Sequence, residues 1–336
     1  MGMKNLKYFA PESLEAAVEI FRSEDGVLYL AGGTDLIPRM KYGLVNATGL
    51  IDLEGIEALK KIEERDDGIF IGSMITMSDL TENKMISERI SPVAFAARCV
   101  ASPQIRNIGT IGGNIFQERR CMYFNQSDDW RRHLTPCYQL GGELCHQIPK
   151  AKTCPAIYYS DLAPILIAYG AAAEVHNGET YEKRPLEEVI ERYVRHGGRK
   201  DLITGFTIPH FGQGAIGKFL KYSVRSSIDF ALSSIGMLFI PGDQKHEKRS
   251  VKIVAGAVSP VPLRLHRTEQ AILENLPDLI QKKEEMYDIA INDLKSQSSL
   301  IRDTVVPLKA RKNSLLIINE VLRDFFRDIN RSFLSP

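Results

Sequence analysis

Two short glycine-rich segments constrain the fold of this 336-residue chain more than any other feature: residues 31–36 (AGGTDL) and residues 104–114 (QIRNIGTIGGN). Glycine allows positive φ and lets another molecule approach the main chain closely. Successive exposed N–H groups in such turns form a concave site for an anion, to which Thr34 and Thr110 each add a hydroxyl. A Gly-Gly pair after a strand is more often only a tight turn, and neither segment fits the GxGxxG or P-loop pattern. The residues alone therefore predict anion-accepting turns, and two of them together suggest one ligand with a diphosphate.

Apolar periodicity around these segments predicts alternating helices and strands. Leu14, Ala17, Val18 and Phe21 share one face of a helix that begins near Pro11. Strands are predicted at residues 27–31, 50–53, 68–74, 219–224, 234–240 and 251–257, and a hairpin at 174–181. Helices are predicted at 78–86, 93–100, 162–172, 268–275 and 314–326, and a linker at 212–217, after residues 202–209 end the first half of the chain. This order argues for a layered fold that contains both helices and sheets.

Charge and hydropathy exclude several partners. The formal net charge is +1, so no basic field exists to hold nucleic acid or an anionic membrane. The longest apolar stretches, such as residues 162–173, are shorter than a membrane span, and the first residues lack the apolar core of a signal peptide. We therefore expect no nucleic acid and no membrane as partners, and a cytoplasmic location.

Four of the five cysteines fall within 34 residues, a clustering that composition alone would rarely produce. They are Cys121, Cys137, Cys145 and Cys154, whereas Cys99 is interpreted as a buried small hydrophobe. Disulfides are not expected in a cytosolic chain, so a metal site is favoured. The wide spacings are atypical of both zinc knuckles and iron–sulfur motifs, which leaves structural zinc, a [4Fe–4S] cluster and free thiols open. The nearby Arg119, Arg120, Arg131 and Arg132 are interpreted as a solvated rim, with charge compensation of a cluster or docking of an acidic carrier as the alternative.

The two glycine segments in this order resemble the paired FAD-binding signatures of the flavoprotein subunits of the xanthine dehydrogenase and carbon monoxide dehydrogenase family. Weaker similarities follow at residues 7–20, 160–171, 205–209 and 255–264. The resemblance implies an α+β fold, with a two-part FAD-binding domain of the CO dehydrogenase flavoprotein/PCMH type and a C-terminal α+β domain. The implied parts are residues 1–57, residues 58–213 and residues 218–336.

The same resemblance implies which residues bind FAD. They are Leu30, Ala31, Gly32, Gly33, Thr34, Asp35 and Leu36 from the first segment, Val100, Gly109, Thr110, Ile111, Gly112, Gly113 and Asn114 around the second, and Asp161, Ile203 and Lys221 further on. On position alone Asp161 is a helix N-cap and Lys221 a strand-surface lysine. The family's RRxxD pattern appears here as VRSSID, so Arg225 and Asp229 are not predicted to belong to the site.

Asn114 and Asp161 are 47 positions apart, whereas far fewer residues separate the corresponding blocks of the family, so the resemblance implies an insertion at about residues 116–155. A four-cysteine insertion at this point resembles the β subunits of 4-hydroxybenzoyl-CoA reductases, a branch of the family. The resemblance implies that Cys121, Cys137, Cys145 and Cys154 ligate a [4Fe–4S] cluster, with His133 and His146 nearby but not ligands.

No constellation for hydrolytic or metal-water catalysis stands out, so no catalytic residue is expected in this chain. The resemblance implies an electron-transfer subunit with FAD and a [4Fe–4S] cluster. Its enzyme would be a molybdenum enzyme that reductively dehydroxylates 4-hydroxybenzoyl-CoA to benzoyl-CoA with reduced ferredoxin. The partners would be a molybdopterin-binding α subunit and a [2Fe–2S] γ subunit. One alternative is the FAD subunit of a xanthine dehydrogenase-like hydroxylase that passes electrons to NAD or quinone. Another is a non-redox binding module stapled by zinc.

Overall fold

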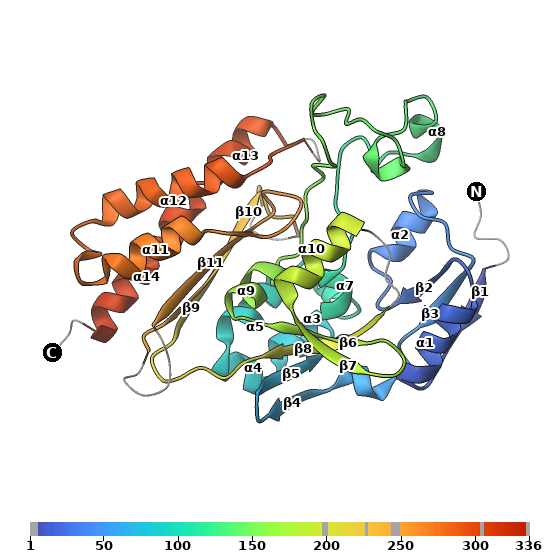
Figure 1. Cartoon of the computed structure of the whole chain (residues 1–336), viewed down its shortest axis with the longest axis horizontal. Helices are drawn as coiled ribbons and strands as arrows, with labels where there is room; N and C mark the ends of the chain where they lie inside the picture. Colours follow the sequence, from blue (N-terminus) through green and yellow to red (C-terminus); the bar gives the residue numbers. More distant parts are fainter. Residues whose placement is uncertain (1–5, 197–200, 226–227, 243–248, 303–305, 334–336) are drawn as a thin grey trace.

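The computed structural model describes residues 6–196, 201–225, 228–242, 249–302 and 306–333. Three β-sheets with helices on their faces form the body of the molecule (Figure 1). Each sheet is built from one stretch of the chain, at residues 7–52, 62–208 and 216–264. Helices and sheets therefore combine as the α+β class predicts, and that prediction is confirmed.

The first sheet is parallel, and the first glycine segment follows its second strand in chain order. Its strands are β1 (Lys7–Phe9), β2 (Val27–Leu30) and β3 (Gly49–Asp52), in the order β1-β3-β2, with α1 (Leu14–Ser23), α2 (Leu36–Lys41) and the 3₁₀ turn η1 (Glu57–Lys60) around them. The Ser13 hydroxyl accepts from the backbone N–H of Ala16 at 3.2 Å and begins α1, as an N-cap does. Leu14, Ala17 and Val18 are then buried on one face, as the periodicity predicts.

The second sheet is antiparallel. Its strands are β4 (Ile62–Arg65), β5 (Gly68–Gly72), β6 (Ala172–His176), β7 (Tyr181–Pro185) and β8 (Leu202–Ile208), in the order β4-β5-β8-β6-β7. Its helices are α3 (Met77–Glu82), α4 (Lys84–Arg89), α5 (Ser91–Arg98), α6 (Pro103–Arg106), α7 (Ile111–Ile115), α9 (Leu162–Ala168) and α10 (Leu186–His196). The turn between β6 and β7 holds Gly178 at φ +95°, as the Asn177-Gly178 signal predicts.

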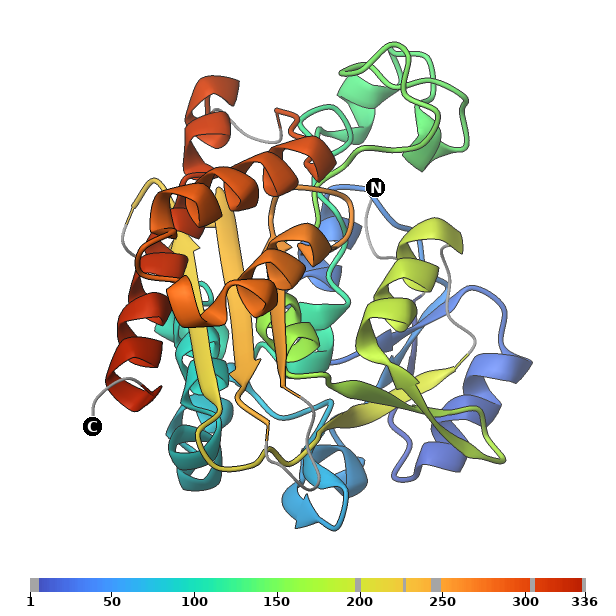
Figure 2. The same cartoon turned by 60° about the vertical axis from the view of Figure 1, so that its left-hand side comes forward.

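The third sheet is buried on both faces. Its strands are β9 (Ile216–Tyr222), β10 (Ser233–Ile240), β11 (Ser250–Gly256) and β12 (Leu263–Arg264), followed by α11 (His266–Glu274), η3 (Leu276–Asp278), α12 (Lys283–Gln297), α13 (Leu308–Ser314) and α14 (Ile317–Phe333). Helices α11, α12 and α14 cover one face, which Figure 2 shows in front of the strands. The opposite face packs on α5 and α9, and Gly236 permits this because a Cβ there would lie 2.6 Å from backbone atoms of Ile165.

The apolar cores run across the borders between the three predicted parts. One cluster joins residues of the second sheet to Phe219, Leu238 and Val254 of the third. Another joins the first sheet to Met74 and Leu202. The division into domains stays a prediction.

The cysteine-bearing insertion, residues 116–155, is mostly loop, with only α8 (Asp128–Arg131) and the 3₁₀ turn η2 (Tyr138–Leu140). It stands at one end of the molecule, between α2 and α13 (Figure 1). Arg131 is 6% exposed and donates to the carbonyl oxygens of Gly43 at 2.7 Å and Phe124 at 3.3 Å, so its interpretation as part of a solvated rim is wrong. On the other side, the backbone N–H of Arg302 donates to Gln147 Oε1 at 2.9 Å. The insertion is therefore anchored by hydrogen bonds to the loop after α2 and to the segment after α12.

Several element boundaries differ from the sequence prediction. The helix expected to reach residue 172 ends at Ala168, because Gly170 adopts φ +68° and Ala171 N–H donates to the carbonyl of Leu166 in a Schellman-type cap. The expected linker at 212–217 already contains the start of β9, and α12 is not predicted. No helix among the described residues is long and apolar enough to span a membrane.

Candidate FAD-binding site

The two glycine segments, far apart in sequence, lie against each other. A Cβ on Gly32 would come 1.9 Å from the carbonyl oxygen of Ile108, so only glycine fits at this position. Gly33 follows with φ +68°, and Thr34 Oγ1 lies 3.5 Å from the place that a Cβ on Gly109 would take. The contact between the loops is thus a backbone contact that the glycines make possible.

The loops offer different groups to a ligand. Among the described residues, no acceptor takes the backbone N–H groups of residues 32–35, which stand at the start of α2. In the second loop the amides are already used, because Gly112 donates to the carbonyl of Ser73 at 2.9 Å and Gly113 donates to Thr110 Oγ1 at 3.0 Å. Thr110 is the N-cap of α7, and its hydroxyl proton is still available. The first loop therefore supplies the N–H groups for an anion and the second supplies a hydroxyl, whereas the sequence predicts exposed N–H groups in both turns.

Two adjoining cavities meet at these loops, with volumes of about 360 and 430 Å³. Both are within the size range of small-molecule and cofactor sites. Residues of the two loops and their neighbour Gln117 line both cavities: Thr34, Asp35, Thr110, Gly113 and Gln117. An elongated ligand with a central anion would place that anion at the shared wall and one end in each cavity.

The first cavity contains a buried ion pair. Asp161 Oδ2 lies 2.7 Å from the Nζ of Lys221, both side chains are 7% exposed, and Lys221 also donates to the carbonyl of Cys99 at 2.8 Å. The other oxygen of Asp161, Oδ1, is enclosed and has no hydrogen-bond partner in the described part of the chain. Burial raises the pKa of Asp161, and the Lys221 ammonium opposes that rise. An unpaired carboxylate oxygen on the wall of a cavity is an acceptor for a ligand hydroxyl.

The N-cap interpretation of Asp161 is not supported by the geometry. Its side chain makes no cap hydrogen bond to α9. The neighbouring Ser160 hydroxyl takes that place, accepting from the backbone N–H of Ala163 at 3.0 Å and donating to Asn114 Oδ1 at 2.6 Å. Asp161 is therefore left for the cavity, while Ser160 joins α9 to the second glycine loop.

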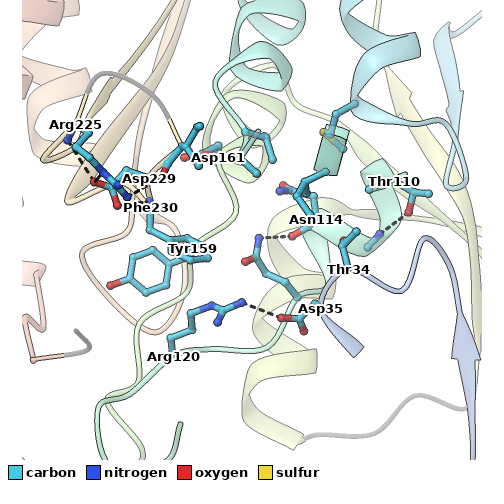
Figure 3. A pocket seen from close by; sticks show the side chains of 18 residues that line it. Thr34, Asp35, Thr110, Asn114, Arg120, Tyr159, Asp161, Arg225, Asp229 and Phe230 are labelled. Carbon is cyan, nitrogen blue, oxygen red and sulfur yellow. Dashed lines mark hydrogen bonds and ion pairs between the residues drawn. The ribbon is translucent and has the colours of Figure 1, made fainter. Parts of the chain in front are cut away.

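Most of the residues predicted to bind FAD line one cavity or the other. The first cavity is lined by Thr34, Asp35, Val100, Gly109, Thr110, Gly113, Asn114 and Asp161 from the predicted set (Figure 3). The second is lined by Ala31, Gly32, Gly33, Thr34, Asp35, Leu36, Thr110, Gly112, Gly113 and Ile203. Leu30, Ile111 and Lys221 line neither cavity. Ile111 is fully buried in the core, and Lys221 acts on the first cavity only through Asp161.

Sequence reasoning missed several residues of the first cavity, namely Arg120, Tyr159, Arg225, Asp229 and Phe230. Arg225 and Asp229, which were not predicted to belong to the site, both line the cavity, and their side chains lie 3.4 Å apart. Their spacing in VRSSID was the available signal, although a serine replaces the second arginine of the family pattern. Arg120, Tyr159 and Phe230 carried no signal.

The second cavity has an aromatic wall that the prediction also missed. Phe21 and Tyr29 stack with ring centroids 4.7 Å apart, and both line the cavity with Tyr193. Burial raises the pKa of Tyr29, so its enclosed hydroxyl, which has no hydrogen-bond partner among the described residues, stays protonated. The Ser73 hydroxyl on the same wall is also enclosed without a partner. Stacked rings beside free hydroxyls suit a planar heterocycle with polar edges.

The four clustered cysteines line one small cavity in the insertion, of about 20 Å³, together with Tyr123, Gln139 and His146 among others. Cys145 Sγ accepts from the backbone N–H of Ile148 at 3.4 Å, and Cys121 Sγ accepts from Gln147 at 3.5 Å. Burial raises the pKa of Cys154, against the effect of the Ala156 amide and Arg119. Within the described ranges no group of three or more His, Cys, Asp or Glu is placed to hold a metal ion. The thiols share a cavity without the close grouping that a single ion needs.

Comparison with known proteins places this geometry in a family. Residues 4–211 match the family described as FAD binding domain in molybdopterin dehydrogenase. The 6-hydroxypseudooxynicotine dehydrogenase complex subunit alpha of Paenarthrobacter nicotinovorans is 33% identical over 82% of this chain and 80% of its own length. The nicotine 6-hydroxylase medium subunit of the same organism is 31% identical, but the match covers only 34% of this chain and 41% of that subunit.

Solved structures agree on the fold. A chain of the reconstituted CO dehydrogenase from Oligotropha carboxidovorans superimposes with a TM-score of 0.73 at 20% identity, over 99% of this chain and 100% of that one. A chain of quinoline 2-oxidoreductase from Pseudomonas putida 86 gives a TM-score of 0.69 at 15% identity, over 99% of each. The chain therefore contains the FAD binding domain of molybdopterin dehydrogenases and is an FAD-binding subunit of the xanthine dehydrogenase/CO dehydrogenase family.

Proposed function

We propose that this chain is the FAD- and [4Fe–4S]-carrying electron-transfer subunit of a molybdenum enzyme that reductively dehydroxylates 4-hydroxybenzoyl-CoA to benzoyl-CoA. The observation that carries the flavin part is the pair of cavities that share the two glycine loops. FAD is an elongated molecule with a diphosphate between two ring systems. Each cavity would hold one ring system, and the glycine loops between the cavities would hold the diphosphate. When bound, it supplies one- and two-electron redox chemistry that protein side chains lack.

The residues present fit FAD on several independent points. The free N–H groups of residues 32–35 and the Thr110 hydroxyl would hold the diphosphate. The unpaired Oδ1 of Asp161 would accept from a hydroxyl of the cofactor. Phe21, Tyr29 and Tyr193 would enclose the ring system of the second cavity, and Val100 and Phe230 that of the first.

The cysteine cavity supports a cluster over a single zinc ion. Cys121, Cys137, Cys145 and Cys154 converge on one cavity, and a [4Fe–4S] cluster takes four thiolates. Among the described residues, no three ligand groups are close enough together to hold a single tetrahedral ion. Burial raises the pKa of Cys154, and Arg119 only opposes that rise, so binding of a metal centre would have to supply the thiolate form.

The proposed partners are a molybdopterin-binding α subunit, a [2Fe–2S] γ subunit and a reduced ferredoxin-type donor. The relatives named as medium subunits or chains support a multi-subunit assembly. The four-cysteine insertion supports the 4-hydroxybenzoyl-CoA reductase branch, because a subunit that delivers electrons from FAD to NAD or quinone needs no additional cluster. The substrate would bind on the α subunit, and this chain would carry electrons only.

The test is anaerobic purification of the chain with its co-expressed partners, followed by analysis of flavin, iron, sulfide and zinc. Flavin with four irons and four sulfides per chain, beyond those of the γ subunit, is the expected result. Flavin alone would favour the hydroxylase subunit, and zinc without flavin would favour the binding module. Cys137→Ser should remove the iron of this chain and largely spare FAD. Turnover of 4-hydroxybenzoyl-CoA with reduced ferredoxin then tests the substrate, and its absence in a fully loaded complex would refute that part.

A further inference from the structure

We propose that Arg120, the residue next to the first cysteine of the insertion, is a positioning residue of the flavin site that donates a hydrogen bond to an acceptor oxygen of the bound cofactor. The inference rests on the proposed FAD function. It gives the insertion a second role, because the same loop that carries the thiols would then also complete the cavity for the dinucleotide.

The Arg120 guanidinium is held firmly in the wall of the first cavity. Its Nη2 donates to Asp35 Oδ1 at 3.0 Å, and its Cζ lies 4.6 Å from the centre of the Phe230 ring (Figure 3). Asp35 belongs to the first glycine loop and Phe230 to the segment before β10, so Arg120 joins two walls that are distant in sequence. An ion pair on one side and an aromatic face on the other fix the plane of the guanidinium.

One enclosed donor of this guanidinium, the Nε of Arg120, has no acceptor among the described residues. A buried guanidinium N–H without an acceptor is costly, and such groups in native proteins call for an explanation such as a ligand. Arg120 lines the cavity, and the proposed ligand is rich in phosphate, carbonyl and hydroxyl oxygens. An oxygen of the ligand would therefore accept the hydrogen bond from Arg120 Nε.

The backbone of Arg120 is fixed by the base of the insertion. Its N–H donates to the carbonyl of Ile157 at 2.8 Å, and the N–H of Ile157 donates back at 3.0 Å. Cys121 follows directly and packs on the cluster that contains Ile157 and Tyr159, and Tyr159 lines the flavin cavity. Residues of the cysteine cavity and of the first flavin cavity therefore meet in one apolar cluster, and the bridge to Ile157 sets the position of the Arg120 backbone.

The local charges leave Arg120 able to serve a ligand. Asp35 also accepts from the backbone N–H of Glu118 at 3.2 Å and lies 3.8 Å from Arg39, which in turn pairs with Glu118 at 3.4 Å. The two arginines and two carboxylates thus neutralise one another. The contribution of Arg120 to FAD is then a directed hydrogen bond rather than bulk positive charge.

The test compares Arg120→Gln and Arg120→Lys with Arg132→Gln, a matched control on the same insertion whose side chain is 64% exposed. Each variant is purified in the full complex, stripped of flavin and titrated with FAD by fluorescence, and the thermal unfolding of each flavin-free form is recorded. Loss of a hydrogen bond from a charged donor should weaken FAD binding about tenfold in Arg120→Gln. Arg120→Lys, which keeps a cationic donor at similar length, should recover part of the affinity, and Arg132→Gln should bind like the wild type.

Equal FAD affinity in Arg120→Gln and Arg132→Gln would overturn the inference while leaving the FAD function in place. The inference would also fail if Arg120→Lys did not recover any of the FAD affinity lost in Arg120→Gln. It would fail as well if the flavin-free Arg120→Gln form were destabilised in proportion to its loss of FAD affinity, because either result would indicate that Arg120 contributes only packing. A wild-type complex that binds no FAD would instead refute the proposed function itself.

Discussion

Replacement of the Asp161–Lys221 pair separates the contribution of this pair to folding from its contribution to FAD binding. The pair is buried, at 2.7 Å, with side chains that are 7% exposed on both residues. Removal of one partner from a buried pair leaves an uncompensated charge and costs about 3–5 kcal/mol. Asp161→Leu should therefore lower the free energy of unfolding by about that amount, because the Lys221 ammonium keeps only the carbonyl of Cys99 as an acceptor.

The double variant Asp161→Leu/Lys221→Met should recover most of this stability. Apolar side chains of similar volume in place of a buried pair are often neutral, so we expect the double variant to lie within about 1 kcal/mol of the wild type. It should nevertheless bind FAD about 10- to 150-fold more weakly, since the unpaired Oδ1 that would accept from a cofactor hydroxyl is gone. The two variants together distinguish loss of fold from loss of the ligand contact.

Urea unfolding of the flavin-free forms followed by circular dichroism measures the first effect, and FAD titration by fluorescence measures the second. Lys221→Met alone removes the other partner of the pair, leaves the Asp161 carboxylate without its ion pair, and should likewise lose about 3–5 kcal/mol. A loss below about 1 kcal/mol in Asp161→Leu would contradict the burial of the pair. Wild-type FAD affinity in the double variant would show that Oδ1 meets no ligand, and the reasoning about the first cavity would fail.

Three further predictions follow from other parts of the structure. Gly32→Ala should cost about 3 kcal/mol of stability and abolish FAD retention, because its Cβ would lie 1.9 Å from the Ile108 carbonyl; a variant that keeps FAD on a desalting column would contradict the contact between the loops. Burial alone would raise the pKa of Glu174, but hydrogen bonds from Thr207, Lys183 and Arg65 outweigh it and lower the pKa from its ordinary 4.5. The resulting stability is present above pH 4.5 and lost as the pH falls through the folded-state pKa, so Glu174→Gln should flatten the acid limb of a melting-temperature profile, and an unchanged limb would refute this. Arg131→Gln should loosen the insertion from Gly43 and speed limited proteolysis within residues 116–155, whereas the exposed Arg132→Gln should not; equal cleavage of both variants would contradict the anchoring role.

Local patterns in the sequence predicted much of the scaffold. The face of Leu14, Ala17 and Val18, the Asn177-Gly178 turn and the two glycine loops all depend on residues close in sequence, and each appears in the structure. The end of α9 was misplaced because apolar residues continue past Gly170, where a left-handed backbone stops the helix and the same apolar run continues as β6. Periodicity reports burial, and it cannot report where one buried element ends and the next begins.

The remaining residues of the candidate site could not be predicted from local sequence patterns. Arg120 lies near the start of the insertion, Tyr159 follows its end, and Phe230 follows β9; only the tertiary fold brings them together around one cavity. Asp161 shows the same limitation, since its position before a helix predicts a cap. Its role in the cavity depends on Ser160, which caps α9 instead, and on Lys221 from a strand 60 residues away. An ion pair can be assigned only when both residues are placed in space, and an atom can be called unpaired only when all of its neighbours are known.

The antiparallel bridge between Arg120 and Ile157 means that the chain leaves the flavin fold and returns to it at one point. A segment whose ends already pair can be lengthened at a cost in closure entropy that grows only with the logarithm of its length. Excision of residues 121–156 in favour of a short turn would thus leave the surrounding strands in register. We therefore expect the surrounding fold to accommodate either the presence or the absence of this loop without rearrangement.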